Sequence, residues 1–180
     1  MKFLLLYATT EGQTRKVFRH IADRLVAAGH SVELLDAAGA EGLEAARFDA
    51  AILGVSLHAG RYQTALLAAA HGQAAALSAR PGLFVSVSLT AAGTDPDERA
   101  ELDRLAAGFL SDAGWQGAEV LQVAGALRFS AYGFFEYWAM RWIARHRGVA
   151  VEGRETIELT DWAALDSAVD AFAARVAAGA

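Results

Sequence analysis

The residues with the clearest chemical potential form one loop near the start of the chain, Thr9-Thr10-Glu11-Gly12-Gln13-Thr14. The loop lies between a short apolar run and a helical pattern, so its backbone N–H groups are expected at a helix N-terminus. Such groups bind phosphate with help from the helix dipole, and threonine hydroxyls can donate further hydrogen bonds. Gly12 permits a tight turn with positive φ. The loop predicts a phosphate site made of amides and hydroxyls, because no lysine or arginine precedes Arg15 in it.

The common nucleotide motifs do not describe this loop, which is neither G-x-x-x-x-G-K-[ST] nor G-x-G-x-x-G. ATP, GTP and dinucleotide sites are therefore disfavoured. A phosphate held without cations is instead typical of FMN sites. The alternative interpretation is an ordinary strand–turn–helix junction with a threonine N-cap. The place of the loop directly after the first apolar run favours the phosphate.

A second group of residues with potential chemistry spans Leu127 to Arg147. This segment holds seven aromatic residues and four arginines against one acid, Glu136, in a chain of net charge −5. In a helix, Phe134, Trp138 and Trp142 would fall on one stripe. Such a stripe suits a flat, apolar and anionic partner. The alternative is an amphipathic helix packed on the edge of the sheet, since aromatic residues at helical spacing usually belong to a core.

Several classes of site are excluded or disfavoured. Cysteine is absent, which excludes disulfides, thiolate metal sites and a thiol nucleophile. The run Gly54-Val55-Ser56-Leu57-His58 approaches the hydrolase motif G-x-S-x-G but lacks its last glycine. No acid-then-histidine order follows it, so a serine hydrolase is disfavoured. We expect no metal site and no nucleic-acid partner.

Short apolar runs alternate with helical patterns along the chain. Strands are expected at 2–7, 31–35, 50–55, 83–89 and 119–126, and helices at 13–28, 62–78, 95–113 and 161–178. This alternation predicts an α/β fold, a doubly wound five-stranded parallel sheet in the flavodoxin-like order 2-1-3-4-5. The aromatic-basic segment is then a helical insert after the fifth strand. Ligands of such sheets bind at the carboxyl ends of strands, so the loops after strands one, three, four and five should form the site.

Length and composition predict one flavodoxin-like domain over residues 1–180, with the insert at about 127–155. The opening Met-Lys-Phe-Leu-Leu-Leu-Tyr has too short an apolar run for a signal peptide and no cleavage site follows it. The longest uncharged aromatic run, Phe129 to Phe135, is seven residues, far below the ~20 that span a bilayer. We expect a cytoplasmic protein, at most peripheral on the inner face of the cell membrane, and leave a homo-oligomer open.

The motifs resemble those of a known family. The first loop is similar to the T-x-T-G-x-T phosphate loop of flavodoxins, with Glu11 replacing the middle threonine. This variant resembles the menaquinone-dependent protoporphyrinogen oxidases, flavodoxin-like bacterial enzymes of haem biosynthesis. The segments that match in order are Thr9 to Thr14, Gly54 to Tyr62, Ser86 to Leu89, Ala124 to Phe129 and Leu159 to Trp162.

The resemblance implies FMN as cofactor, with oxidation of protoporphyrinogen IX in three two-electron steps that end on menaquinone. Because the flavin carries the redox chemistry, no catalytic side chain is expected. The implied cofactor-binding residues are Thr9, Thr10, Glu11, Gly12, Gln13, Thr14, Ser56, Leu57, His58, Ala59, Gly60, Arg61, Tyr62, Ser88, Leu89, Thr90 and Ala91. The chain departs from the family where Arg then Tyr are usual, at His58 and Ala59, and where a basic residue is usual, near Ala92. Arg61 could replace one lost charge.

The resemblance also gives the insert two roles. The expected substrate-binding residues are Arg128, Phe129, Tyr132, Trp138 and Arg141, which could stack against a tetrapyrrole and pair with its propionates. A helix over 128–147 could also lie on a membrane surface, since tryptophan favours the interface and arginine favours anionic headgroups. The expected partners are therefore a porphyrinogen, a quinone and a membrane surface.

Three other functions compete with this hypothesis. A flavodoxin-type electron carrier is usually more acidic and has no basic aromatic insert. An FMN-dependent quinone reductase that uses NAD(P)H would need a nucleotide fingerprint, and none is visible. A flavin-free interaction module would keep the fold and bind no FMN.

Overall fold

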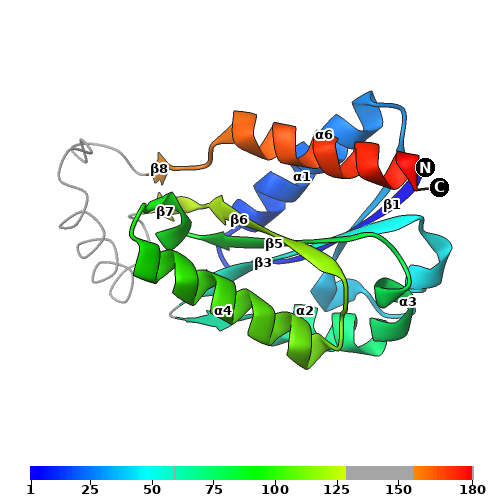
Figure 1. Cartoon of the computed structure of the whole chain (residues 1–180), viewed down its shortest axis with the longest axis horizontal. Coiled ribbons are helices and arrows are strands. Elements are labelled where there is room, and N and C mark those ends of the chain that lie inside the picture. The colour runs from blue at the N-terminus through cyan, green and yellow to red at the C-terminus, as the bar shows by residue number, and fades with distance from the viewer. Residues whose placement is uncertain (59, 129–155, 180) are drawn as a thin grey trace.

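A parallel sheet with helices on both faces forms the centre of the molecule (Figure 1). The computed structural model describes residues 1–58, 60–128 and 156–179. The central strands are β1 (Lys2–Ala8), β2 (Ser31–Asp36), β3 (Ala50–His58), β5 (Gly82–Ser88) and β6 (Ala118–Ala124). They pair in parallel in the order β2-β1-β3-β5-β6, which confirms the predicted order 2-1-3-4-5. The short β4 (Arg61–Tyr62) pairs antiparallel with the end of β3.

Helices cover the two faces of this sheet in separate layers. The long helices are α1 (Gln13–Ala27), α2 (Thr64–Gly72), α4 (Pro96–Ala113) and α6 (Trp162–Ala178), with the short α3 (Ala74–Ser78) after α2. Figure 1 shows α1 and α6 on one face and α2, α3 and α4 on the other. Alternate residues of β1 enter two different cores, Phe3 and Leu5 on the face of α1 and α6, Leu4 and Leu6 on the opposite face. This burial on both faces explains why the central strands β1 and β3 are nearly continuous apolar runs.

Local signals in the sequence set the positions of the helices. The Asp95 carboxylate accepts hydrogen bonds from the N–H groups of Asp97 and Glu98, and Pro96 opens α4. Asp161 caps α6 in the same way. The close packing of α1 depends on Gly54, because a Cβ there would lie 2.1 Å from the Phe18 ring.

Two predicted elements differ from the structure. The helix expected over 62–78 is instead β4, α2 and α3, with a break at Gln73. Gly60, at φ 75°, turns the chain back so that Arg61 pairs with His58, and the helix begins only at Thr64. The fifth strand, expected to reach residue 126, stops at Ala124, and the chain passes through Gly125 into another sheet.

That second sheet is a two-stranded antiparallel ribbon of β7 (Ala126–Arg128) and β8 (Thr156–Glu158). Its strands flank segment 129–155 in the sequence, and Arg128 lies opposite Thr156. The predicted insert helix lies outside the described residues. Among the helices that the structure describes, none is long and apolar enough to cross a membrane.

Candidate functional site

The predicted phosphate loop lies at the carboxyl end of β1 and leads directly into α1. Gly12 is the N-cap of α1 and has φ 86°, the conformation that its lack of a Cβ allows. Its N–H donates to the Thr9 hydroxyl at 2.9 Å, which closes the loop on itself. No side chain caps α1. The amides of its first turn, from Gln13 onward, therefore have neither an intrahelical carbonyl nor a side-chain cap, as an anion site requires.

Two oxygens in this loop are enclosed without a hydrogen-bond partner among the described residues. They are the Thr14 hydroxyl, in a residue that is 0% exposed, and one carboxylate oxygen of Glu11. An unpaired buried hydroxyl costs about 1–3 kcal/mol, so such atoms are rare without a ligand to serve. A bound phosphate would give the Thr14 hydroxyl an acceptor. The loop therefore fits the phosphate that the sequence predicts.

Positive charge reaches the loop from α1 itself. A Cβ added at Gly12 would lie 3.5 Å from an Arg15 guanidinium nitrogen, so this cation lies beside the loop. Lys16, one residue further on, is instead held by Glu158, with its Nζ 2.6 Å from the carboxylate. Of these two cations of α1, Arg15 is the one that can offset the charge of Glu11 and of a phosphate. The sequence suggested only amides and hydroxyls.

Gln63 connects two of the predicted site loops and was missed by the sequence reasoning. Its side-chain amide lies 2.6 Å from the Thr10 hydroxyl and 2.8 Å from the Ser56 hydroxyl. With its oxygen and nitrogen exchanged, the amide also accepts from the Thr10 N–H at 3.1 Å and donates to the Ala8 carbonyl at 3.2 Å. In either orientation Gln63 joins the phosphate loop to the end of β3. It lies just after the matched run 54–62, where no motif marked it.

The loop after β3 turns back on itself through the β3–β4 pairing. Leu57 lies opposite Tyr62 and His58 opposite Arg61, so these four predicted residues are brought together at the carboxyl end of the sheet. Leu57 and His58 are half-buried, and Gly60 and Arg61 are exposed. Ala59, also a predicted contact, lies outside the described residues.

Tyr62 is held more firmly than the sequence suggested. Its ring meets Phe84 and Phe109 edge-on, with centroids 5.7 and 5.3 Å away, and its hydroxyl lies 2.9 Å from that of Ser86. Burial raises the pKa of its phenol, although the bond to Ser86 opposes the shift. The phenol is therefore a fixed neutral group, and its predicted role as flavin cover stays a prediction.

The loop after β5 contains a short 3-10 turn, η3 (Thr90–Ala92), which follows Ser88, the last residue of the strand. The buried Ser88 hydroxyl accepts from the Ala91 N–H at 3.1 Å, and the Ser88 carbonyl accepts from the Gly125 N–H at 3.0 Å. Ser88 thus fixes both the η3 turn and the exit from β6. Leu89, Thr90 and Ala91 are half-buried at this end of the sheet, where they were predicted.

A hydrogen-bond network joins the ribbon β7–β8 to the helix that carries the phosphate loop. The Gln13 amide donates to Glu158 at 3.0 Å and to the Thr160 hydroxyl at 3.1 Å, and Lys16 pairs with Glu158. Thr160 in turn donates to the Ala124 carbonyl at 2.7 Å. The Trp162 ring lies under the Lys16 ammonium, 5.2 Å from it. Glu158 and the matched run Leu159 to Trp162 therefore hold the ribbon β7–β8 beside the phosphate loop.

The predicted substrate residues have one member within the described part of the chain. Arg128 ends β7, opposite Thr156, on the ribbon just described. Phe129, Tyr132, Trp138 and Arg141 lie outside the described residues, so their roles stay predictions.

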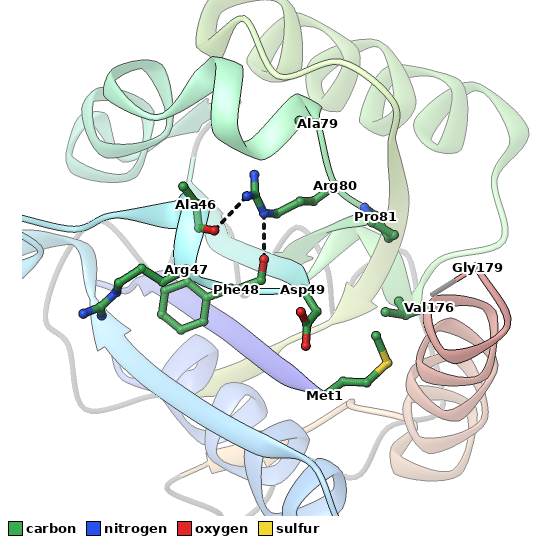
Figure 2. Close-up of a pocket in the computed structure, with 10 residues that line it drawn as sticks. All are labelled: Met1, Ala46, Arg47, Phe48, Asp49, Ala79, Arg80, Pro81, Val176 and Gly179. Atoms are coloured by element: carbon green, nitrogen blue, oxygen red, sulfur yellow. Dashed lines mark hydrogen bonds between the residues drawn. The ribbon is translucent and has the colours of Figure 1, made fainter.

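A pocket of about 350 Å³ opens at the other end of the sheet, near both chain termini (Figure 2). Its most conspicuous group is Arg80, whose guanidinium donates to the carbonyls of Phe48, Ala76 and Ala46 at 2.6, 2.5 and 2.7 Å. The arginine is saturated by backbone carbonyls and ties α3 to η2 (Ala45–Arg47). This pocket is far from the strand ends that bind ligands in such folds, and we read it as structural.

Comparison with known proteins decides the family. A family model described as "Flavodoxin domain" matches residues 4–150. The chain belongs to this flavodoxin-domain family. Membership of it implies a flavin site, and the loops after β1, β3 and β5 lie where a flavodoxin domain would hold one.

Two curated relatives of this flavodoxin domain are named protoporphyrinogen IX dehydrogenase [quinone]. That of Escherichia coli (strain K12) is 28% identical over 90% of this chain and 89% of its own length. That of Leishmania major is 30% identical over 96% of this chain and 75% of its own length. These matches confirm the family that the sequence motifs indicated.

Solved structures agree on the flavodoxin fold. Oxidised flavodoxin 2 from Bacillus cereus superposes with a TM-score of 0.57 at 19% identity, over 97% of this chain and 99% of its own. Rubredoxin oxygen:oxidoreductase from Desulfovibrio gigas gives 0.57 at 12% identity, over 98% of this chain and 36% of its own. At such identities the likeness establishes the fold alone.

Proposed function

We propose that this protein is an FMN-dependent protoporphyrinogen oxidase, which converts protoporphyrinogen IX to protoporphyrin IX in haem biosynthesis with a quinone, menaquinone, as electron acceptor. The observation that carries the proposal is the extent of the match to the two dehydrogenases. Both relatives carry the same printed name, and they match 90% and 96% of this chain at 28% and 30% identity. A likeness in sequence that extends over nearly the whole chain favours this activity over that of an electron carrier.

The geometry supports FMN as the flavin. The amides at the start of α1 and the hydroxyls of Thr9, Thr10 and Thr14 would hold its phosphate, with Arg15 as counter-ion. The loops 57–62 and 88–91 would lie on either side of its ring system. When bound, FMN would accept electrons from the porphyrinogen and pass them to the quinone.

The chain's own work in this proposal is to bind and orient. Gln63 and Ser56 hold the phosphate loop against the end of β3, which keeps the cofactor site formed before binding. Arg128 and Arg141 would pair with substrate carboxylates, and Phe129, Tyr132 and Trp138 would stack on the tetrapyrrole. The segment 128–147 would bring these groups to the inner face of the membrane, where the quinone is dissolved. No covalent nucleophile is needed.

The proposal is tested by anaerobic mixing of the FMN-loaded protein with protoporphyrinogen IX and a menaquinone analogue, with porphyrin fluorescence as the signal. We expect porphyrin to form only when both FMN and quinone are present. The variant Trp138→Ala/Trp142→Ala should lose most of this rate while it retains FMN. Tight FMN binding with no porphyrin above the autoxidation control would contradict the proposal and favour an electron carrier or another quinone reductase.

A further inference from the structure

At the free edge of the sheet, β6 runs between α4 and α6 (Figure 1). Residues of β6, α4 and α6 line a groove of about 590 Å³ there. Its wall is mainly apolar, with Leu121 on β6, Leu159 before α6 and Leu165 on α6. Ala91 and Ala92 form the end of the groove. Because Ala91 is also among the predicted flavin contacts, the groove shares the η3 turn with the flavin site. Its volume is within the range of small-molecule sites.

Arg99, on the first turns of α4, is the cation of this groove. Its Nε donates to the Gly93 carbonyl at 3.3 Å, which holds the guanidinium next to η3. Its terminal nitrogens have no hydrogen-bond partner and no acid pairs with it within the described ranges. Arg104, further along the same helix, is instead paired with Glu101. Arg99 therefore has two nitrogens available for an anion.

The other polar groups of the groove differ in the hydrogen bonds that they can still form with a ligand. The Asp161 carboxylate already accepts from the Ala164 N–H as the N-cap of α6. Gln122 donates through its nitrogen to Asp103 at 3.2 Å, which fixes the direction of the amide. Its oxygen is enclosed and has no partner among the described residues. The groove thus combines apolar walls, an available guanidinium and an unused acceptor that would take an N–H donor.

We propose that this groove is a subsite for an apolar ring compound that carries carboxylates and ring N–H groups, with Arg99 as the carboxylate partner and Gln122 as acceptor. The inference rests on the proposed function, because a porphyrinogen has propionates, pyrrole N–H groups and an apolar body. Guanidinium binds carboxylate through two parallel hydrogen bonds, which fixes orientation as well as charge. The substrate would then extend from the flavin past η3 into the groove.

The charge contact is tested with protoporphyrin IX and its dimethyl ester, which differ only at the carboxylates. Affinities for the FMN-loaded full-length protein are measured from the quenching of porphyrin fluorescence. Arg99→Gln should weaken the free acid on the order of tenfold and leave the ester unchanged. The matched control is Arg104→Gln, which removes the same charge from the same helix outside the groove. Equal effects of the two variants, or equal weakening of acid and ester by Arg99→Gln, would overturn the proposal.

Occupancy of the groove is tested separately by filling it. Ala164 lines the groove and Ala163, its exposed neighbour on α6, does not. Ala164→Trp should weaken acid and ester alike, and Ala163→Trp should weaken neither. Unchanged affinities in Ala164→Trp would show that the porphyrin lies elsewhere.

The experiments can contradict the groove proposal and the proposed oxidase activity independently of each other. If porphyrin is produced and Arg99→Gln raises the KM for protoporphyrinogen more than it lowers kcat, both stand. If porphyrin is produced and Arg99→Gln behaves like Arg104→Gln in affinity and KM, the groove is excluded and the function remains. If no porphyrin is produced but Arg99→Gln still discriminates acid from ester, the carboxylate subsite stands and the oxidase does not.

Discussion

The two ends of the sheet each have a pocket with an arginine in it, and the two arginines are used differently. At the amino end, Arg80 donates to three backbone carbonyls within a pocket of about 350 Å³. Near the carboxyl end, Arg99 donates to one carbonyl beside a groove of about 590 Å³. Buried oxygens without a partner among the described residues follow the same division, because those of Glu11, Thr14 and Gln122 all lie towards the carboxyl end. A buried donor without a partner does not follow it, since the Trp115 indole nitrogen lies at the amino end, beside Gly82. Unused oxygens, and not the presence of a pocket, therefore distinguish the binding end of the sheet from the structural end.

The largest effect should come from the structural arginine. Arg80→Gln removes guanidinium donors from the carbonyls of Ala46, Phe48 and Ala76. Because hydrogen bonds to charged groups are strong, we expect a loss of about 3 kcal/mol in the free energy of unfolding, measured by urea denaturation. FMN affinity should not change. Arg99→Gln, at an exposed residue with one carbonyl contact, should cost less than about 0.5 kcal/mol. Comparable losses in the two variants would remove the distinction between the two ends.

Removal of the buried Thr14 hydroxyl should raise the stability of the FMN-free protein, opposite to the loss expected for Arg80→Gln. Thr14→Val keeps the shape of the side chain and removes an oxygen that has no partner in the described structure. We expect the FMN-free protein to gain about 1 kcal/mol in stability, because the cost of burying the hydroxyl disappears. FMN affinity should fall on the order of tenfold in fluorescence titrations, since a phosphate contact is lost.

Thr160→Val is the matched control for this substitution. The Thr160 hydroxyl donates to Ala124 and accepts from Gln13, so its removal should cost about 1 kcal/mol of stability. If Thr14→Val also destabilises the FMN-free protein, the hydroxyl has a structural role instead.

Substitution of Gln63 and of Gln73 compares two hydrogen bonds between loops, one beside the cofactor site and one away from it, in their effects on stability and on FMN affinity. Gln63 joins Thr10 to Ser56 beside the cofactor site, and Gln73 accepts from the Ala45 N–H at 2.9 Å on the other side of the fold. Both leucine variants should lose about 1 kcal/mol of stability. Gln63→Leu should in addition weaken FMN severalfold, because the phosphate loop is less well formed before binding. Equal FMN affinities of Gln63→Leu and Gln73→Leu in calorimetric titrations would show that Gln63 does not prepare the cofactor site.

The sequence predicted the strands and helix ends of this molecule better than the side-chain contacts of its candidate site. The strand positions followed from apolar runs, because central strands buried on both faces leave a local signal, and the caps Asp95 and Asp161 are local as well. The strand order followed from the alternation of strands and helices, which is typical of a doubly wound sheet. The helix expected from residue 62 was wrong because alanine-rich propensity is a weak prior and Gly60 reverses the chain. Gln63 and Arg99 left no local signal. Their meaning depends on partners brought close by packing, such as Thr10, 53 residues from Gln63.

The smallest expected effect concerns the network that holds β8 to α1. Burial raises the pKa of the Glu158 carboxyl, but hydrogen bonds from Lys16 and Gln13 outweigh it, so the folded pKa is below the usual value. A lowered folded pKa contributes stability that is complete above the unfolded pKa of about 4.3 and is lost as pH falls through the folded value. The contribution should be below about 1 kcal/mol, because Lys16 is 56% and Glu158 31% exposed.

Urea denaturation of the wild type and Glu158→Gln from pH 7 to pH 3 measures this contribution. We expect the wild type to be more stable at pH 7 and the difference to vanish towards pH 3. Added salt should reduce the difference at pH 7, because exposed charges are screened. A difference that persists unchanged at pH 3 would mean that Glu158 acts through neutral hydrogen bonds. The strand β8 would then be held to the phosphate loop independently of charge.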